Sequence, residues 1–403
     1  MELVSRNILF RITMLVIIIF PLVPAATTPY LGLFAGAYFL VYLLKDKEAL
    51  KRFRRSLRNF RHAFSTSTYV FILVAFISLF YSMNKAMSAE GVLIYFSAFV
   101  FFMLIKYEIN RTIYILPLLR AYFLSNILVA LYHIGQILYA EVVQGVPFDS
   151  LTHVSVMSNA PSLAYFLLIP LFPALTLYIL KENARDSRFY MVVVTTALIS
   201  IFMTGSRIAI IGVFVGLALL SLLYSFKFLI ALIPTGLFLI LIPIFTRRHS
   251  AYFILNREFG RLTFWKEILL DNQKYILFGR GINTFSETFH TYMEGKMPLL
   301  NLELVNHPYN APLEILMEMG IIGLAVAIIL SINMIRAIAA YTRSKKATSF
   351  FRVAYVGVMV SMIVFLLLNL VDSYIMNPKI VYSVAILLAI MNGDAKFKGI
   401  SLT

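Results

Sequence analysis

The chain has 403 residues, of which 61% are hydrophobic and only 13% are charged. Soluble domains carry about 25% charged residues, so this composition excludes an ordinary soluble protein and indicates a polytopic membrane protein. The net charge of +16 does not indicate nucleic acid, because much of the excess lies in short loops where anionic lipid headgroups attract it. The absence of Cys excludes disulfides, thiol catalysis and Cys-based metal sites.

Mainly apolar runs recur along the whole sequence, each long enough to cross a hydrocarbon core about 30 Å thick. We predict an all-α protein with about twelve transmembrane helices, because a backbone in lipid must satisfy its own hydrogen bonds. The first span carries Arg6 and Arg11 and no cleavage site, so we expect it to be retained. The predicted spans are 8–26, 28–44, 67–83, 91–105, 112–138, 159–180, 189–205, 208–226, 228–246, 312–341, 353–371 and 377–392.

Basic loops set the predicted orientation, since cytoplasmic loops carry an excess of Lys and Arg. Loops 181–188 and 342–352 are basic and fall on the same side as loop 45–63. Segments 139–158 and 247–311 then lie outside, and both termini are cytoplasmic. The basic residues of loop 45–63 are Lys45, Lys47, Lys51, Arg52, Arg54, Arg55, Arg58 and Arg61.

We predict one transmembrane domain over residues 1–403, with a large external insertion at 247–311 between the ninth and tenth spans. Within the insertion, residues 255–269 have the spacing of an amphipathic helix that lies on the membrane surface or caps a cavity. A Gly279-Arg280-Gly281 turn follows, and Asn-His-Pro-Tyr-Asn at 306–310 precedes the tenth span. The apolar positions of the helix are Leu255, Phe259, Leu262, Trp265 and Leu269.

Three cationic or titratable residues are the strongest candidates for chemistry. Arg207 lies between the seventh and eighth spans with apolar neighbours, so it either faces a polar cavity or extends to the interface. Arg261 and His307 lie in the insertion, where each alone is an ordinary surface residue. Together they fit transfer from a diphosphate donor, because guanidinium groups bind phosphate and a neutral His accepts a proton.

Two carboxylates near the start of the tenth span are further candidates. Glu314 and Glu318 are one helical turn apart on one face. They either line an acceptor cavity, or Glu318 pairs with an arginine as a structural tie. Asp372 stands alone at the outer end of the eleventh span. We expect no metal and no cofactor, because the segments outside the membrane lack a His-x-x-x-His pair, a close Asp pair and a Gly-rich phosphate loop.

Several short motifs, in this order on this topology, resemble the bacterial O-antigen ligase and polymerase superfamily over roughly residues 190–325. The motifs are Ser206-Arg207, Arg261 followed by Trp265, Phe278-Gly279-Arg280-Gly281, and the stretch from Asn306 to the Gly320-Ile-Ile-Gly323 sequence. The resemblance implies a GT-C-like membrane glycosyltransferase of the bacterial inner membrane, with a metal-independent, inverting site at the periplasmic face. It further implies an undecaprenyl diphosphate-linked glycan donor, with Arg207 and Arg261 as its diphosphate-binding residues and a loop His as the base or as the group that positions the acceptor.

The chain departs from the family signature, which reads His-Asn, nine residues, then Gly-x-x-Gly. Here the Asn is Asn310, the glycines are Gly320 and Gly323, and the position before Asn310 is Tyr309. Either His307, two residues upstream, replaces the usual base, or the base is absent. Tyr309, with an ordinary pKa near 10, is a poor base at neutral pH but can orient a hydroxyl.

The first functional hypothesis is an O-antigen ligase that passes the glycan to a sugar hydroxyl of lipid A-core. The alternatives within the superfamily are a polysaccharide polymerase, whose acceptor is a growing glycan, and a protein O-oligosaccharyltransferase. A different class is a secondary transporter or flippase, for which we would expect two related halves with broken helices at the membrane midplane. Ser206 and Arg280 are assigned with Glu314 and Glu318 to acceptor binding or structural support.

Overall fold

The structure is a computed structural model in which helices account for nearly all of the described residues, and no strand occurs among them. Each predicted span except the ninth coincides with a helix, whereas the ninth lies almost wholly outside the described residues. The structure describes residues 2–58, 63–109, 112–145, 156–157, 159–180, 184–226, 228, 230, 264–270, 272–293, 307–343 and 349–397.

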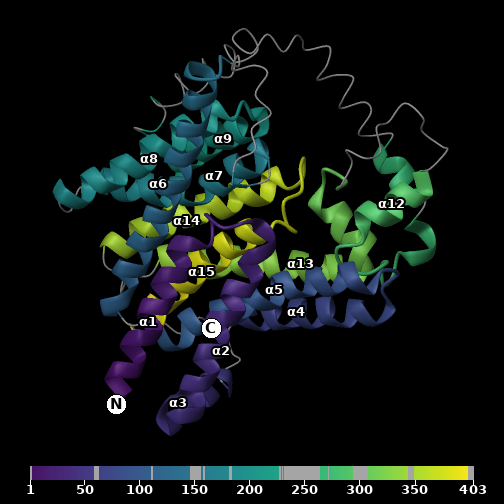
Figure 1. Cartoon of the computed structure of the whole chain (residues 1–403), viewed down its shortest axis with the longest axis horizontal. Coiled ribbons are helices and arrows are strands. Elements are labelled where there is room, and N and C mark those ends of the chain that lie inside the picture. Colours follow the sequence, from purple (N-terminus) through teal and green to yellow (C-terminus); the bar gives the residue numbers. More distant parts are fainter. Residues whose placement is uncertain are drawn as a thin grey trace.

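The helices form a bundle that a membrane can accommodate (Figure 1). The helices that coincide with predicted spans are α1 (Glu2–Ile19), α2 (Thr28–Lys45), α4 (Ala63–Tyr81), α5 (Lys85–Leu104), α6 (Thr112–Val142), α7 (Ala160–Leu180), α8 (Ala184–Met203), α9 (Arg207–Leu223), α13 (Ala311–Thr342), α14 (Ser349–Leu368) and α15 (Pro378–Phe397). Within the described residues, 8 helices are long and apolar enough to cross a membrane, and α9 and the 378–390 part of α15 are shorter apolar helices. The chain is therefore a polytopic helical membrane protein, as predicted.

The centre of the bundle is built on α7, which packs against α14, α8 and α9. Pro170 and Pro173 lie inside α7, and a proline cannot donate to the carbonyl four residues before it. Ser361 of α14 donates its hydroxyl to the Ile169 carbonyl at 2.8 Å, which is the acceptor that Pro173 leaves without a partner. The α7–α14 contact is thus specified by a hydrogen bond as well as by apolar packing.

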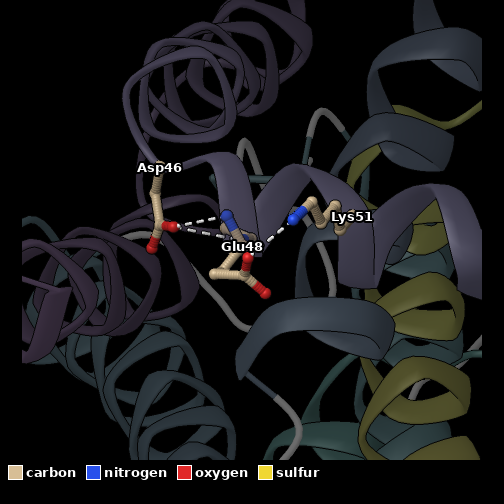
Figure 2. Close-up of polar contacts among 4 residues, drawn as sticks. Asp46, Glu48 and Lys51 are labelled. Atoms are coloured by element: carbon tan, nitrogen blue, oxygen red, sulfur yellow. Dashed lines mark hydrogen bonds and ion pairs between the residues drawn. The ribbon is translucent and has the colours of Figure 1, made fainter.

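The basic stretch predicted as the loop 45–63 contains a helix, α3 (Lys47–Arg58), so this part of the prediction is corrected. Asp46 begins it, because its Oδ1 accepts the backbone N–H groups of Glu48 at 2.9 Å and Ala49 at 3.0 Å (Figure 2). The ring of Phe53 packs edge-on against Phe39 of α2 at 5.5 Å. The apolar face of α3 therefore packs against the bundle, while Lys47, Lys51 and Arg54 are exposed.

Helix α13 is broken near its start, and this break organises the adjacent outer segment. Gly320 has φ 66° and ψ −170°, a conformation almost confined to glycine. The segment 275–281 fills the break: Arg280 N–H donates to the Met317 carbonyl at 3.0 Å, and Ile321 N–H donates to the Ile276 carbonyl at 2.8 Å. The helix α12 (Phe285–Met293) follows and lies beside the ends of α4, α5 and α13 at the right of Figure 1.

The remaining described elements are short. A 3-10 turn, η1 (Ala25–Thr27), joins α1 to α2, and η4 (Asn272–Tyr275) precedes the break-filling segment. A π-helical turn, η2 (Ile105–Ile109), extends α5. The insertion predicted at 247–311 thus contains helical structure where it is described.

Candidate active site

The turn that precedes α13 holds three of the predicted site residues next to one another. Asn310 is the N-cap of α13, because its Oδ1 accepts the Leu313 N–H at 2.8 Å. Its Nδ2 donates to the Leu370 carbonyl at 2.8 Å, which ties the turn to the segment after α14. Tyr309 has φ 54°, an uncommon conformation for a residue other than glycine. Asn310 is therefore a structural joint that fixes the positions of His307 and Tyr309.

The His307 ring is held between two tyrosine rings. Its centroid lies 4.6 Å from that of Tyr309, edge to face, and 6.0 Å from that of Tyr374 in the α14–α15 connection. The next residue, Pro308, is buried and accepts the indole N–H of Trp265 at 2.7 Å. The neighbouring Tyr309 and the distant Tyr374 therefore restrict the orientation of this imidazole, and Trp265 holds the backbone beside it.

The segment around Trp265 packs against the turn that holds His307. Residues 264–270 are helical, and Phe264 and Ile268 are buried against Phe285 and Phe289 of α12. Leu269, on the predicted apolar face, is 46% exposed. Arg261 and the rest of the predicted helix, residues 255–263, lie outside the described residues.

A polar cluster lies next to Tyr374, which contacts the His307 ring. Ser373 donates its hydroxyl to the Glu314 carboxylate, and its backbone N–H donates to Asp372 Oδ1 at 2.9 Å. Glu314, Asp372 and Ser373 are all buried. Asp372 has no acidic neighbour in the sequence, but in the fold Ser373 contacts both its carboxylate and that of Glu314. The contact joins residues far apart in sequence, and no local pattern could have revealed it.

Tyr374 completes the cluster. Its ring packs against Tyr165, near the start of α7, at 4.2 Å between centroids. Burial, with a smaller effect from the negative charge of Asp372, raises the pKa of Tyr374 well above its usual value. This tyrosine, which the sequence did not single out, therefore stays protonated at neutral pH and can donate a hydrogen bond.

Glu318 acts as a structural tie, but its partner differs from the one predicted. Its Oε1 accepts the Phe285 N–H at 3.3 Å, and the backbone N–H groups of Asn283 and Thr284 also bind this carboxylate. These groups lie at the start of α12, so Glu318 ties α13 to the beginning of that helix. An arginine was the expected partner; backbone N–H groups take that place.

Arg280 also has a structural role, because it is buried where several segments meet. It is 6% exposed, and its guanidinium carbon lies 4.8 Å from the ring centroid of Tyr275. Its carbonyl accepts the Met83 N–H at 2.9 Å, so the α4–α5 turn, the 275–281 segment and α13 meet at this residue. The Arg280 side chain is thus enclosed by protein where the segment crosses the α13 break.

Arg207 is the first residue of α9, directly after the tight turn that ends α8. Ser206 is the N-cap, with its Oγ 3.4 Å from the Ala209 N–H, and Gly205 has φ 62°. Arg207 is half-buried. The free N–H groups of a helix N-terminus favour anions, and a guanidinium at this position adds a permanent positive charge.

Shared neighbours bring the Arg207 turn and the His307 turn to the same end of the bundle. Gly212, five residues after Arg207, lies against Leu368 and Leu168. Leu368 ends α14, and the following residue, Asn369, accepts the Ala311 N–H at 2.8 Å beside the His307 turn. Both turns therefore flank the ends of α7 and α14 that carry Tyr165 and Leu368.

Residues 192–328 match the family model described as O-antigen ligase. This part of the chain is similar to the O-antigen ligase family. The O-antigen ligase domain runs from α8 into α13 and contains every residue predicted for the site, from Ser206 to Glu318. The resemblance predicted from the short motifs is confirmed over nearly the same residues. No curated protein matches the chain.

The match to the O-antigen ligase family indicates the general class of reaction. This family consists of glycosyltransferase-type membrane enzymes that act on lipid-linked glycans. The polytopic helical fold agrees with that class. The family match and the helical membrane fold together support an enzyme of the membrane glycosyltransferase class, at this coarse level.

Proposed function

We propose that the protein transfers a glycan from an undecaprenyl diphosphate-linked donor to a sugar hydroxyl at the periplasmic face of the bacterial inner membrane. As an O-antigen ligase, it would use lipid A-core as the acceptor. The observation that carries this proposal is the O-antigen ligase domain at 192–328, which spans both the Arg207 turn and the His307 turn.

The donor diphosphate is assigned to Arg207 and Arg261. Arg207 adds its guanidinium to the N-terminus of α9, so two sources of positive potential coincide there. Arg261 precedes the helical segment that Trp265 fixes to the His307 turn at Pro308. The two arginines would stabilise the negative charge that develops on the departing diphosphate.

His307 is assigned as the base. The acceptor hydroxyl oxygen attacks the anomeric carbon and forms the new glycosidic bond, while the bond from that carbon to the diphosphate oxygen breaks. The bond electrons leave with undecaprenyl diphosphate, the hydroxyl proton goes to His307, and the configuration inverts. The packing of the imidazole between Tyr309 and Tyr374 supports this role, because a base must be held in one orientation to be effective. Tyr309 would orient the acceptor hydroxyl.

The test is glycan transfer by the purified protein from undecaprenyl diphosphate-linked donor to lipid A-core, in the presence of a chelator. We expect Arg207→Ala, Arg261→Ala and His307→Ala each to lower the rate by at least about 100-fold, in the range of lost acid–base or electrostatic catalysis. Arg120→Ala is the matched control, because Arg120 pairs with Asp186 at 2.7 Å, away from the proposed site.

The products distinguish the alternatives. Lengthened donor chains without labelled lipid A-core would replace the ligase by the polymerase, and labelled protein hydroxyls would replace it by an O-oligosaccharyltransferase. Full activity of His307→Ala would remove His307 as base. No donor consumption under any condition would overturn glycan transfer and favour transport.

A further inference from the structure

An exposed apolar loop crosses the outside of the α13 break. Ile276 is 44% exposed, Leu277 58% and Phe278 57%, and Tyr275 before them is 37% exposed. Residues 275–278 are called the apolar loop below. Four consecutive large apolar side chains on a loop are costly in water, at roughly 25 cal/mol for each Å² left hydrated. Their exposure needs an apolar partner.

Two backbone carbonyls of the apolar loop accept hydrogen bonds from the protein. The Ile276 carbonyl accepts the Ile321 N–H at 2.8 Å, and the Tyr275 carbonyl accepts the Gly279 N–H at 2.7 Å. Just beyond the loop, Gly281 N–H donates to the Glu318 carbonyl at 2.8 Å. Non-helical backbone at membrane depth is tolerated where protein satisfies its polar groups, and these bonds satisfy the Tyr275 and Ile276 carbonyls.

The apolar loop continues the lipid-facing surface of the neighbouring helices. The Phe278 ring lies 6.0 Å from that of Tyr81, the last residue of α4. On the same end of α4, Phe80 is 70% exposed, and on α13, Ile321 is 50% exposed. The exposed apolar residues of two predicted spans and of the loop therefore form one surface.

The length of α4 fixes the depth of this surface. Its 19 residues extend about 28 Å, so nearly all of them are needed to cross a hydrocarbon core about 30 Å thick. The turn of α4 that contacts Phe278 must then lie within or at the edge of the hydrocarbon. Polar residues begin immediately beyond, with Asn84 and Lys85 after α4 and with Gln273 and Lys274 before the loop.

We propose that residues 275–278 are a re-entrant segment inserted among the lipid acyl chains of the leaflet on the Asn84 side of the membrane. The partner is the apolar region of the phospholipid bilayer. Insertion holds the α13 break, Arg280 and the start of α12 at headgroup depth, where the headgroup of a lipid-linked substrate also lies. This membrane contact stands independently of the proposed glycan transfer.

The experiment uses the absence of Cys from the chain. Leu277→Cys and Phe278→Cys each provide a single thiol for an environment-sensitive fluorophore on the full chain in phospholipid nanodiscs. Gln273→Cys is the matched control, because Gln273 is also exposed but precedes the apolar run. Leu73→Cys, at a 56% exposed position on α4, is the reference within the membrane.

We expect labels at 277 and 278 to emit at shorter wavelength than the label at 273. They should be quenched by lipids with a spin label high on the acyl chain, and several-fold less by iodide than the label at 273. Equal iodide quenching at 273, 277 and 278 would overturn the proposal.

A second measurement uses the native chain and needs no substitution. An apolar carbene reagent confined to the bilayer should label residues 275–278 as it labels Phe80. If the reagent labels Phe80 but does not label residues 275–278, the proposed insertion is wrong.

Discussion

At the scale of single residues, Asn310 illustrates how one side chain serves the fold and the candidate site together. Its oxygen caps α13 and its amide N–H binds the Leu370 carbonyl, so it joins the start of one helix to the end of another. His307 and Tyr309 precede it on the same turn. Their orientation therefore depends on a residue that needs no contact with the substrate.

Substitution of Asn310 separates its two roles. Asn310→Ala removes the cap and the tie, and we expect a loss of about 2 kcal/mol in the free energy of unfolding, from roughly 1 kcal/mol for each role. Asn310→Ser restores a capping oxygen and should recover about half. Thermal unfolding in detergent measures both variants, and equal stability of Asn310→Ala and the native chain would refute the role of Asn310 as a joint.

At the scale of elements, the break in α13 shows how the outer segment is built into a transmembrane helix. Gly279 and Gly320 both have positive φ, and a Cβ at either would overlap the backbone of the opposite segment. Gly320 therefore permits the break through its backbone conformation and its close approach to the 275–281 segment.

Two glycines with nearly the same φ allow a controlled test of this role. Gly320→Ala would meet Leu277 and Phe278, whereas Gly205, at φ 62°, has nothing within 4 Å of an added Cβ. We expect Gly205→Ala to cost only the backbone strain of about 1–2 kcal/mol. Gly320→Ala should cost several kcal/mol and greatly reduce the yield of folded protein. Similar melting temperatures for the two variants would contradict the close approach.

At the scale of the whole molecule, the sequence predicted the helical architecture well because the spans are long and apolar. It missed α3, since the high charge of the basic stretch was interpreted as a loop even though Ala49, Leu50 and Phe53 have helical spacing. The ninth span and the exact number of spans stay predictions, as does the single loop from 247 to 311.

The candidate site was predictable only where its residues are close in sequence. His307, Tyr309 and Asn310 share one turn, so the sequence placed them together. The contacts of Glu314 with Ser373 and of His307 with Tyr374 join segments that are far apart in the sequence, and nothing in local spacing specifies them. Arg207 approaches the same end of the bundle only because α9 packs beside α7 and α14.

The most direct test of the central claim is the binding of undecaprenyl diphosphate, without glycan, to the purified protein in nanodiscs. Arg207→Ala should weaken binding by about 10-fold or more, because a charged hydrogen bond contributes roughly 1.5–3 kcal/mol. His307→Ala, which alters the proposed base alone, and the control Arg120→Ala should bind like the native chain. Native affinity in Arg207→Ala would contradict the assignment of the diphosphate to the Arg207 turn, and with it the site proposed at this end of the bundle.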